Sequence, residues 1–150
     1  MGIEIRLARD VTQAIAERAR AAWPQEGCGL LLGASENGAV RVSAILPAAN
    51  VAPDPSRHFE VDPAVLIGVH RAARSGGLAV VGCYHSHPSG VAVPSATDAA
   101  MAGGQGRVWA IAAPVAVPVP GGGAASLWRI GWWWAGDDGF ETLSTRVDDG

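Results

Sequence analysis

Segments with a two-residue apolar period alternate with amphipathic helical segments along this chain of 150 residues, and this order constrains the fold most strongly. Strands are predicted at residues 3–7, 26–33, 39–46, 78–87, 107–114, 124–135 and 140–147. Helices are predicted at residues 10–23, 61–77 and 94–102. Elements in this order favour an α/β or α+β fold with a single mixed β-sheet flanked by helices. The chain has the length of one domain and no internal repeat, so residues 1–150 are expected to form a single domain.

Residues that favour helix ends mark the first two helices. Asp10 is the expected N-cap of the first helix, and Gln13 follows three residues later in a capping-box pattern. Asp62 is the expected N-cap of the second helix, Pro63 takes its first position and Gly76 terminates it. The apolar stripe of the first helix consists of Val11, Ile15, Ala19, Ala22 and Trp23.

Three further patterns concern connections and the core. The "SENG" segment at residues 35–38 predicts a turn between two paired strands. The "VAVPVPGGG" segment at residues 115–123 predicts a flexible connection. In "WWW", Trp132 and Trp134 lie on one face of a strand and Trp133 on the other, and all three are expected to pack in the core.

The composition disfavours several classes of protein. A net charge of −3 with scattered arginines argues against a nucleic-acid surface. The opening residues are charged and no apolar run reaches a spanning length, so neither a signal peptide nor a membrane span is expected. Cys28 and Cys83 do not make a disulfide framework and are expected to pack as small apolar side chains. These features predict a soluble cytoplasmic protein, and they leave its oligomeric state open.

The segment "GCYHSHPSGVAVPSATD", residues 82–98, contains candidate metal ligands. Residues two apart in a strand project from the same face, so His85 and His87 can direct both rings at one ion. Zinc favours imidazole ligands, and a catalytic zinc site adds a third protein ligand while leaving a position open for water. Asp98 is the nearest carboxylate downstream, and it shares a helix face with Ser95, three residues earlier.

The same residues also have a purely structural interpretation. Ser95 followed by Asp98 is typical of a helix N-cap with an acidic residue in the first turn. Other zinc patterns are absent from the sequence, including HExxH, a second histidine cluster and the Pro-Cys-x-x-Cys of nucleobase deaminases. The residue pattern alone therefore leaves both a metal site and a capped helix open.

A resemblance to a known family favours the metal site. His85-Ser-His87-Pro88, followed by Ser95 and Asp98, resembles the JAMM motif of the JAB1/MPN/Mov34 metalloproteases. That motif also requires a glutamate near the end of the first helix, where Glu26 stands in "PQEGCGLLLG". The "RHFEVDP" segment before the second helix is likewise similar to the family, and the resemblance covers roughly residues 1–135. It implies the JAB1/MPN architecture, which is similar to that of cytidine deaminases.

The resemblance also implies a role for each residue of the motif. His85, His87 and Asp98 would hold Zn²⁺, which lowers the pKa of a bound water to about 7. Glu26 would accept the proton of this water and return it to the departing amine. Ser95 would donate a hydrogen bond to the oxyanion, a contribution of about 3 kcal/mol in comparable sites.

The implied activity is that of a zinc-dependent metallopeptidase or isopeptidase. The compact bacterial members that the chain resembles act on ubiquitin-like or sulfur-carrier proteins ending in Gly-Gly, and others act on peptides in phage-tail assembly. "HSHPSGVAVPSATD" is also similar to RadC-type proteins, although the chain is not basic and lacks the helical extension usual there. A non-catalytic MPN scaffold is a third alternative, which the intact motif disfavours. His58 and His70 receive no role, and Asn50 and Asp54 are expected to form loop turns.

Overall fold

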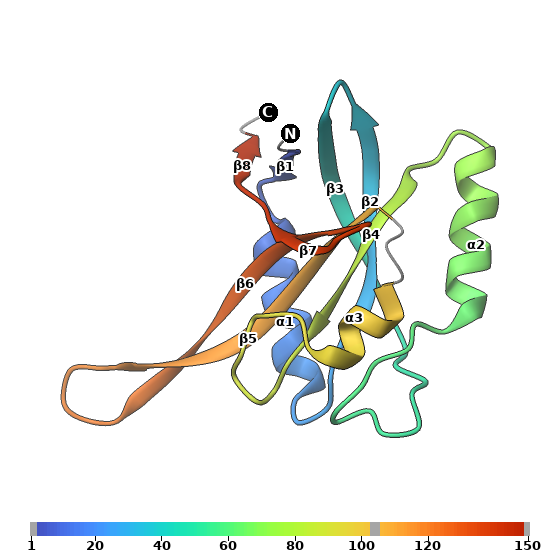
Figure 1. Cartoon of the computed structure of the whole chain (residues 1–150). Coiled ribbons are helices and arrows are strands. Elements are labelled where there is room, and N and C mark those ends of the chain that lie inside the picture. Colours follow the sequence, from blue (N-terminus) through green and yellow to red (C-terminus); the bar gives the residue numbers. More distant parts are fainter. Residues whose placement is uncertain (1–2, 103–105, 149–150) are drawn as a thin grey trace.

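The structure is a computed structural model that describes residues 3–102 and 106–148 of the chain. Within these residues, three helices surround one mixed sheet with the strand order β7-β6-β5-β4-β2-β3-β1-β8 (Figure 1). The elements are β1 (Glu4–Ala8), α1 (Val11–Ala22), β2 (Cys28–Glu36), β3 (Ala39–Ala48), α2 (Pro63–Arg74), β4 (Ala79–Ser86), α3 (Ala96–Ala102), β5 (Arg107–Pro118), β6 (Ala124–Gly136), β7 (Gly139–Thr142) and β8 (Thr145–Asp148). The fold predicted from the sequence, a single mixed sheet flanked by helices, is confirmed.

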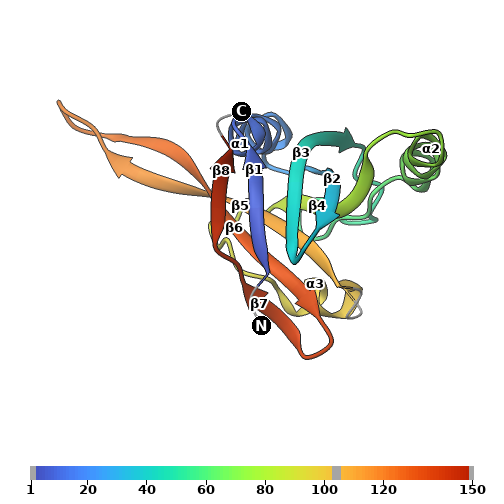
Figure 2. The same ribbon diagram turned by 90° about the horizontal axis from the view of Figure 1, so that it is seen from above.

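The larger hydrophobic core lies between α1 and the sheet. Val11, Ile15 and Ala19 of α1 are buried, as the apolar stripe predicted, in one cluster with Leu31 of β2 and Val42 of β3. Full burial of a side chain such as Ile15 stabilises the fold by about 1.5–3 kcal/mol relative to exposure. α1 and α3 lie on opposite sides of the sheet (Figure 2), so the face that α1 does not cover remains for α3.

The sheet curls until its two edge strands are joined by the short link between Thr142 and Thr145. In this link the Leu143 amide donates to the Trp132 carbonyl of β6, and the Ser144 carbonyl accepts from the Ile5 amide of β1. The single strand predicted at residues 140–147 is therefore wrong. The chain changes edges in the middle of this segment, so its two halves pair with β6 and with β1.

The hairpin of β5 and β6 projects from the body as a two-stranded arm, residues 114–128 (Figures 1 and 2). Its strands stay paired as far as Pro118 and Ala124, although the neighbouring β4 ends at Ser86. The flexible connection predicted at 115–123 is thus wrong for residues 115–118, which continue β5. The turn of the arm contains Gly121, Gly122 and Gly123, all with positive φ.

The signals for helix ends are confirmed in α2, and the capping box predicted for α1 is wrong. The Asp62 carboxylate accepts a hydrogen bond from the Ala64 amide at the start of α2. Asp10 precedes α1 but makes no side-chain cap hydrogen bond, and Gln13 donates to Glu17 on the same helix instead. An exposed glutamine can reach the side chain four residues later on its own helix face, which competes with the capping geometry.

The tryptophans divide between the core and the surface. Trp132 is buried with Trp134 packed against the same cluster, and Trp133 packs against the cluster on the other face, as the two-residue period predicted. Trp23, which the sequence assigned to the apolar stripe, is 59% exposed. α1 ends at Ala22 and Trp23 has extended backbone angles, so its side chain leaves the stripe.

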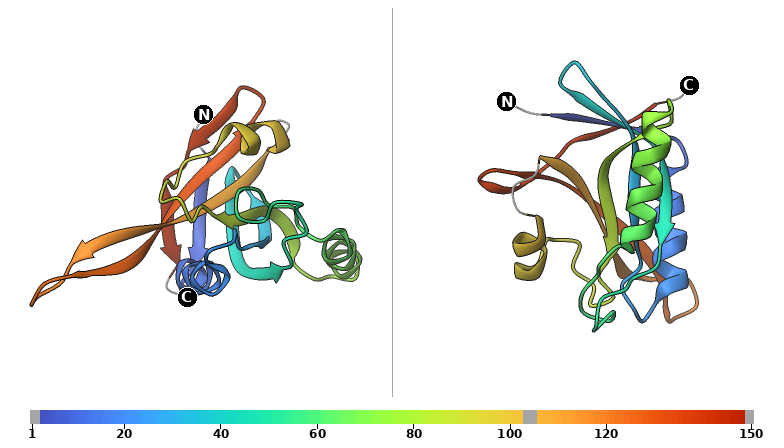
Figure 3. Two further views of the ribbon diagram at one scale, coloured as in Figure 1. Left: turned by 90° about the horizontal axis from the view of Figure 1, so that it is seen from below. Right: turned by 90° about the vertical axis from the view of Figure 1, so that its right-hand side faces the viewer.

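α2 is only lightly embedded in the molecule. Val69 is its buried residue, and Ile67 on the same helix is 54% exposed. The helix runs along the outside of the sheet beside β4, at a distance from α3 (Figure 3, right). No helix in the described part of the chain is long and apolar enough to cross a membrane.

Close approach of two backbones at Gly82 gives a test of the register of β4 and β5. A Cβ added at Gly82 would collide with the Val108 carbonyl of β5. We expect Gly82→Ala to lower the free energy of unfolding by about 3 kcal/mol or more. Gly68→Ala is the control, because a Cβ on exposed α2 meets nothing within 4 Å, and we expect it to stabilise by about 0.5–1 kcal/mol. Urea unfolding measures both, and a Gly82→Ala protein as stable as the wild type would contradict this register.

Candidate metal centre

Four polar side chains from three segments meet at the end of β4 where the chain leaves the sheet. His85 is on β4, His87 directly follows the strand, Asp98 is in the first turn of α3, and Glu26 lies between α1 and β2. All four are buried, with exposed fractions of 0%, 7%, 3% and 5%, respectively. Burial of so many ionisable groups in one place is costly unless they are paired or bind a cation.

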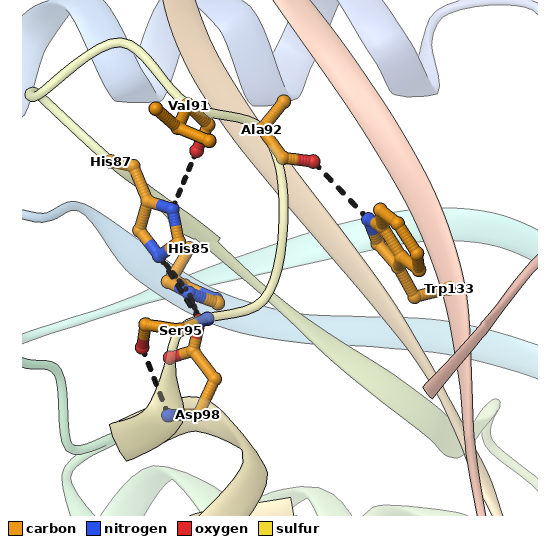
Figure 4. Close-up of polar contacts among 7 residues, drawn as sticks. All are labelled: His85, His87, Val91, Ala92, Ser95, Asp98 and Trp133. Carbon is orange, nitrogen blue, oxygen red and sulfur yellow. Dashed lines mark hydrogen bonds and ion pairs between the residues drawn. The ribbon is translucent and has the colours of Figure 1, made fainter. Parts of the chain in front are cut away.

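The two imidazoles and the Asp98 carboxylate converge on one point (Figure 4). The Nε2 atoms of His85 and His87 are 2.9 Å apart, and each lies 3.1 Å from Oδ2 of Asp98. Ligand atoms about 2.0–2.1 Å from a tetrahedral zinc ion are separated by about 3.3 Å. The donor set and its spacing therefore fit a tetrahedral metal ion after a shift of a few tenths of an ångström.

Asp98 is held in place by the cap of its own helix. Its Oδ2 accepts a hydrogen bond from the Ser95 amide at 2.9 Å, and Oγ of Ser95 accepts from the Asp98 amide at 3.0 Å. The sequence left a capped helix and a metal site as alternatives. The geometry makes them compatible, because the cap orients the carboxylate that faces both histidines.

The ionisation states of these groups depend on one another. Burial favours the neutral form of Asp98, but hydrogen bonds with His85, His87 and the Ser95 amide outweigh burial and hold its pKa well below the usual range. Burial lowers the pKa of His85. Burial acts in the same direction on His87, yet hydrogen bonds with Asp98 and the Val91 carbonyl raise its pKa. The ionised Asp98 carboxylate and the neutral His85 imidazole are in the forms that bind a cation, whereas the raised pKa of His87 favours a proton that a bound cation would displace.

Glu26 lies close to the two histidines. Its carboxylate and the ring nitrogens of His85 and His87 lie within 4.8 Å of one another, which makes a cluster compatible with a metal site. Its Oε1 atom is buried and has no hydrogen-bond partner among the residues described. Burial, opposed by the charge of His87 and reinforced by that of Asp98, raises the pKa of Glu26 to about 7. Such a carboxyl can both accept and release a proton near neutral pH.

Ser86 fixes the Glu26 segment to the His-x-His strand. Its side chain accepts a hydrogen bond from the Gly27 amide at 2.8 Å, and its own amide donates to the Gly27 carbonyl at 3.0 Å. The residue between the two histidines thereby locates the residue that follows Glu26. Ser86 received no role from the sequence, since nothing local indicates so distant a partner.

The loop between His87 and Ser95 is held against the sheet by two contacts (Figure 4). Nδ1 of His87 lies 2.7 Å from the Val91 carbonyl, which leaves Nε2 to face His85 and Asp98. The indole of Trp133 donates to the Ala92 carbonyl at 3.2 Å. Trp133 was assigned to the core from sequence, and this second role, which locates the loop that carries Ser95, was missed.

Aromatic side chains cover His85. The ring of Phe59 stacks on it, with centroids 4.1 Å apart and planes 16° from parallel, and Trp109 meets it edge-on. Phe59 lies in the "RHFEVDP" segment, which the resemblance singled out without assigning it a contact. Behind these rings, a cavity of about 280 Å³ extends between α2 and α3, lined by side chains that include Leu66 and Met101.

The two cysteines pack beside the site. Both are free, Cys28 is buried, and Cys83 lines the cavity between α2 and α3. Burial raises the pKa of Cys28 to about 11, and burial also raises that of Cys83. Both side chains therefore remain protonated thiols near neutral pH, in keeping with the packing role expected from the sequence.

Comparison with known proteins identifies the family. Residues 8–131 match the prokaryotic homologs of the JAB domain. The chain belongs to this family. This JAB-domain chain is 40% identical to the desampylase of Haloferax volcanii over 112 residues, which is 72% of the chain and 79% of the relative. It is 39% identical over 75 residues to a probable TtuB-protein conjugate cleaving protease of Thermus thermophilus, 50% of the chain and 47% of that relative.

Two solution structures resemble the JAB-domain chain along nearly its whole length. A protein of Desulfitobacterium hafniense has a TM-score of 0.79 and 25% identity, over 97% of this chain and 94% of the other. A protein of Salinibacter ruber has a TM-score of 0.61 and 31% identity, over 96% and 92%. These likenesses agree with the JAB1/MPN architecture that the sequence motif implied.

The raised pKa of Glu26 makes the stability of the metal-free protein depend on pH. Folding raises this pKa from 4.5 to about 7, so the stability is full below the lower value and falls as pH rises through the higher one. The shift corresponds to at most about 3 kcal/mol. We expect Glu26→Gln to raise the free energy of unfolding at pH 8 by about 1–3 kcal/mol, with a much smaller change at pH 5. Denaturant unfolding of chelator-treated protein measures this, with exposed Glu141→Gln as the control; equal gains at both pH values would contradict a raised pKa.

Proposed function

We propose that the chain is a zinc-dependent metallopeptidase that cleaves the peptide or isopeptide bond after the C-terminal Gly-Gly of a ubiquitin-like or sulfur-carrier protein. The observation that carries this proposal is the convergence of His85, His87 and Asp98 beside a buried carboxyl with a pKa of about 7. The two relatives, a desampylase and a probable TtuB-protein conjugate cleaving protease, supply the substrate class.

The roles follow from distance and charge. We assign His85, His87 and Asp98 as the zinc ligands, because their donor atoms lie 2.9–3.1 Å apart. Glu26 belongs to the same cluster at up to 4.8 Å, and its raised pKa suits a general base better than a permanently ionised ligand. Zinc in this position would act as a Lewis acid on the substrate carbonyl and on the attacking water.

In the proposed reaction, residues of the chain transfer the proton of the attacking water and stabilise the negative charge of the oxyanion. Glu26 takes a proton from the attacking water and transfers it to the departing amine. Oγ of Ser95 already accepts from the Asp98 amide, so its own proton is free to donate to the oxyanion. Because Ser95 and Asp98 share one helical turn, the hydroxyl that donates to the oxyanion stays at a fixed distance from the carboxylate that binds zinc.

The extended tail of the substrate would have to reach the cluster past the aromatic rings of Phe59 and Trp109, which pack around His85. Glycine residues before the cleaved bond let the substrate backbone pass these rings closely, because no side chain meets the wall. A cytoplasmic location, where both cysteines stay reduced, completes the proposal.

Zinc content tests the ligand set. We expect the purified protein to bind about one zinc ion per chain, and Asp98→Ala to weaken zinc binding at least about 100-fold. The control is Asp138→Ala, an exposed aspartate outside the cluster. Competition with a chromogenic chelator measures the affinity, and thermal unfolding shows whether each variant is folded. A folded Asp98→Ala protein with wild-type zinc affinity would remove Asp98 from the ligand set.

A panel of fusions tests the substrate. One ubiquitin-like carrier is fused to a reporter through Gly-Gly, Ala-Ala or Gly-Val before the cleaved bond, and we expect cleavage of the Gly-Gly fusion at least about tenfold faster in kcat/KM. Glu26→Gln should lose nearly all turnover while keeping zinc, because an amide cannot accept the proton. Equal cleavage of all three fusions would indicate a less selective peptidase, such as one acting on phage-tail peptides. Cleavage of none by the zinc-loaded protein would reject the proposed activity.

A further inference from the structure

The side-chain amide of Asn50, just after β3, is hydrogen-bonded to backbone groups of two separate segments. Its Nδ2 donates to the carbonyls of Glu26 and His58, both at 2.9 Å, and to that of Pro55 at 3.4 Å. Its Oδ1 accepts from the amides of Ala52, at 3.1 Å, and Glu60, at 3.0 Å. The contact with Ala52 is the loop turn expected from the sequence, and the contacts with Glu26, His58 and Glu60 go beyond it.

Glu26 depends on such contacts for its position. It belongs to neither α1 nor β2, and a cavity of about 180 Å³ at the end of α1 borders it, so packing on that side does not fix it. Its backbone is instead held on both sides. The Glu26 amide donates to the Pro55 carbonyl at 2.7 Å, and its carbonyl accepts from Asn50.

The same amide also determines the position of Phe59. The carbonyl of His58 and the amide of Glu60, which flank Phe59 in the chain, both bond to Asn50. The Phe59 ring stacks on His85 at 4.1 Å. One side chain thus connects the segment that carries Glu26 to the aromatic cover of a histidine in the site.

We propose that Asn50 is a positioning residue for catalysis, which holds the Glu26 carboxylate at its working distance from the His85, His87 and Asp98 cluster. This inference rests on the proposed function, since it assigns Asn50 to the step that Glu26 performs. Misplacement of a catalytic group by about 1 Å can slow a reaction about 100-fold, so a single backbone hydrogen bond at this point has a measurable effect.

Variants separate the donor contacts of Asn50 from its acceptor contacts. Asn50→Asp keeps an oxygen that can accept from Ala52 and Glu60 but removes the donor to Glu26, Pro55 and His58. Asn50→Ala removes donor and acceptor without introducing a charge. Ser56→Ala is the matched control, because Ser56 lies in the same loop and bonds to the Asp54 carboxylate, away from Glu26.

Kinetics on the Gly-Gly fusion should separate positioning from binding. We expect Asn50→Asp and Asn50→Ala to lower kcat about 10- to 100-fold, with KM within about twofold and zinc affinity within about threefold of wild type. Ser56→Ala should match the wild type. A loss shared by both Asn50 variants assigns the effect to the missing donor, since only one of them carries a new charge.

A double-mutant cycle and hydrogen exchange decide the inference. In the Glu26→Gln background, Asn50→Asp should change the residual rate less than about twofold, because its effect acts through Glu26. Wild-type kcat in Asn50→Asp, or losses that multiply in the double mutant, would overturn the inference while leaving the proposed activity intact. If the wild type cleaves no fusion, hydrogen exchange of the Glu26 amide still tests the inference. This amide should exchange faster in Asn50→Asp than in the wild type, while the amides of Ala52 and Glu60 stay protected. An unchanged exchange rate of the Glu26 amide would reject positioning by Asn50.

Discussion

Burial of five polar side chains at one end of the sheet is the constraint on which the rest of the structure depends: Glu26, His85, Ser86, His87 and Asp98. A buried polar group without a partner costs about 1–3 kcal/mol, and a charge costs more. Ser86 therefore pairs with Gly27, Asp98 with the Ser95 amide, and His87 with the Val91 carbonyl. The loops around the site follow paths that bring these backbone groups to the buried side chains, while Oε1 of Glu26 has no hydrogen-bond partner among the described residues.

One face of the sheet forms the hydrophobic core, and the other carries the candidate site. The face toward α1 is apolar, and Ile15, Leu31 and Val42 are completely buried there. The other face carries the histidines, covered by the aromatic rings of Phe59 and Trp109. Because the strand period assigns neighbouring residues of β4 to opposite faces, Tyr84 serves the apolar core while His85 serves the site. The site is thus built on a strand that the core already fixes.

Local patterns could be predicted from the sequence, and long-range contacts could not. The strand period brought His85 and His87 together, and the helical spacing brought Ser95 to Asp98, because both depend only on nearby backbone geometry. Glu26 entered through the family resemblance alone, since no local signal links it to a strand so far along the chain. Phe59, Ser86 and Trp133 contact the site through tertiary packing. The change of edge between β7 and β8 was missed for the same reason: a curled sheet, which the sequence pattern does not reveal, brings two opposite edges within reach of one short link.

The arm of β5 and β6 is a part of this fold whose length can change. The His87 amide donates to the Ala112 carbonyl, which lies on the edge of β5 that faces away from β6. Residues two and six further along turn their backbone nitrogens to the same edge. These residues are Pro114 and Pro118, which have no N–H to donate there. A strand edge interrupted in this way is a poor template for pairing with other chains. Adding or deleting two residue pairs would keep every remaining side chain of the arm on its face, because the strand period is two, and would leave the cluster of His85, His87 and Asp98 untouched. The length of the arm can therefore change without moving the cluster and without presenting an uninterrupted strand edge to other chains.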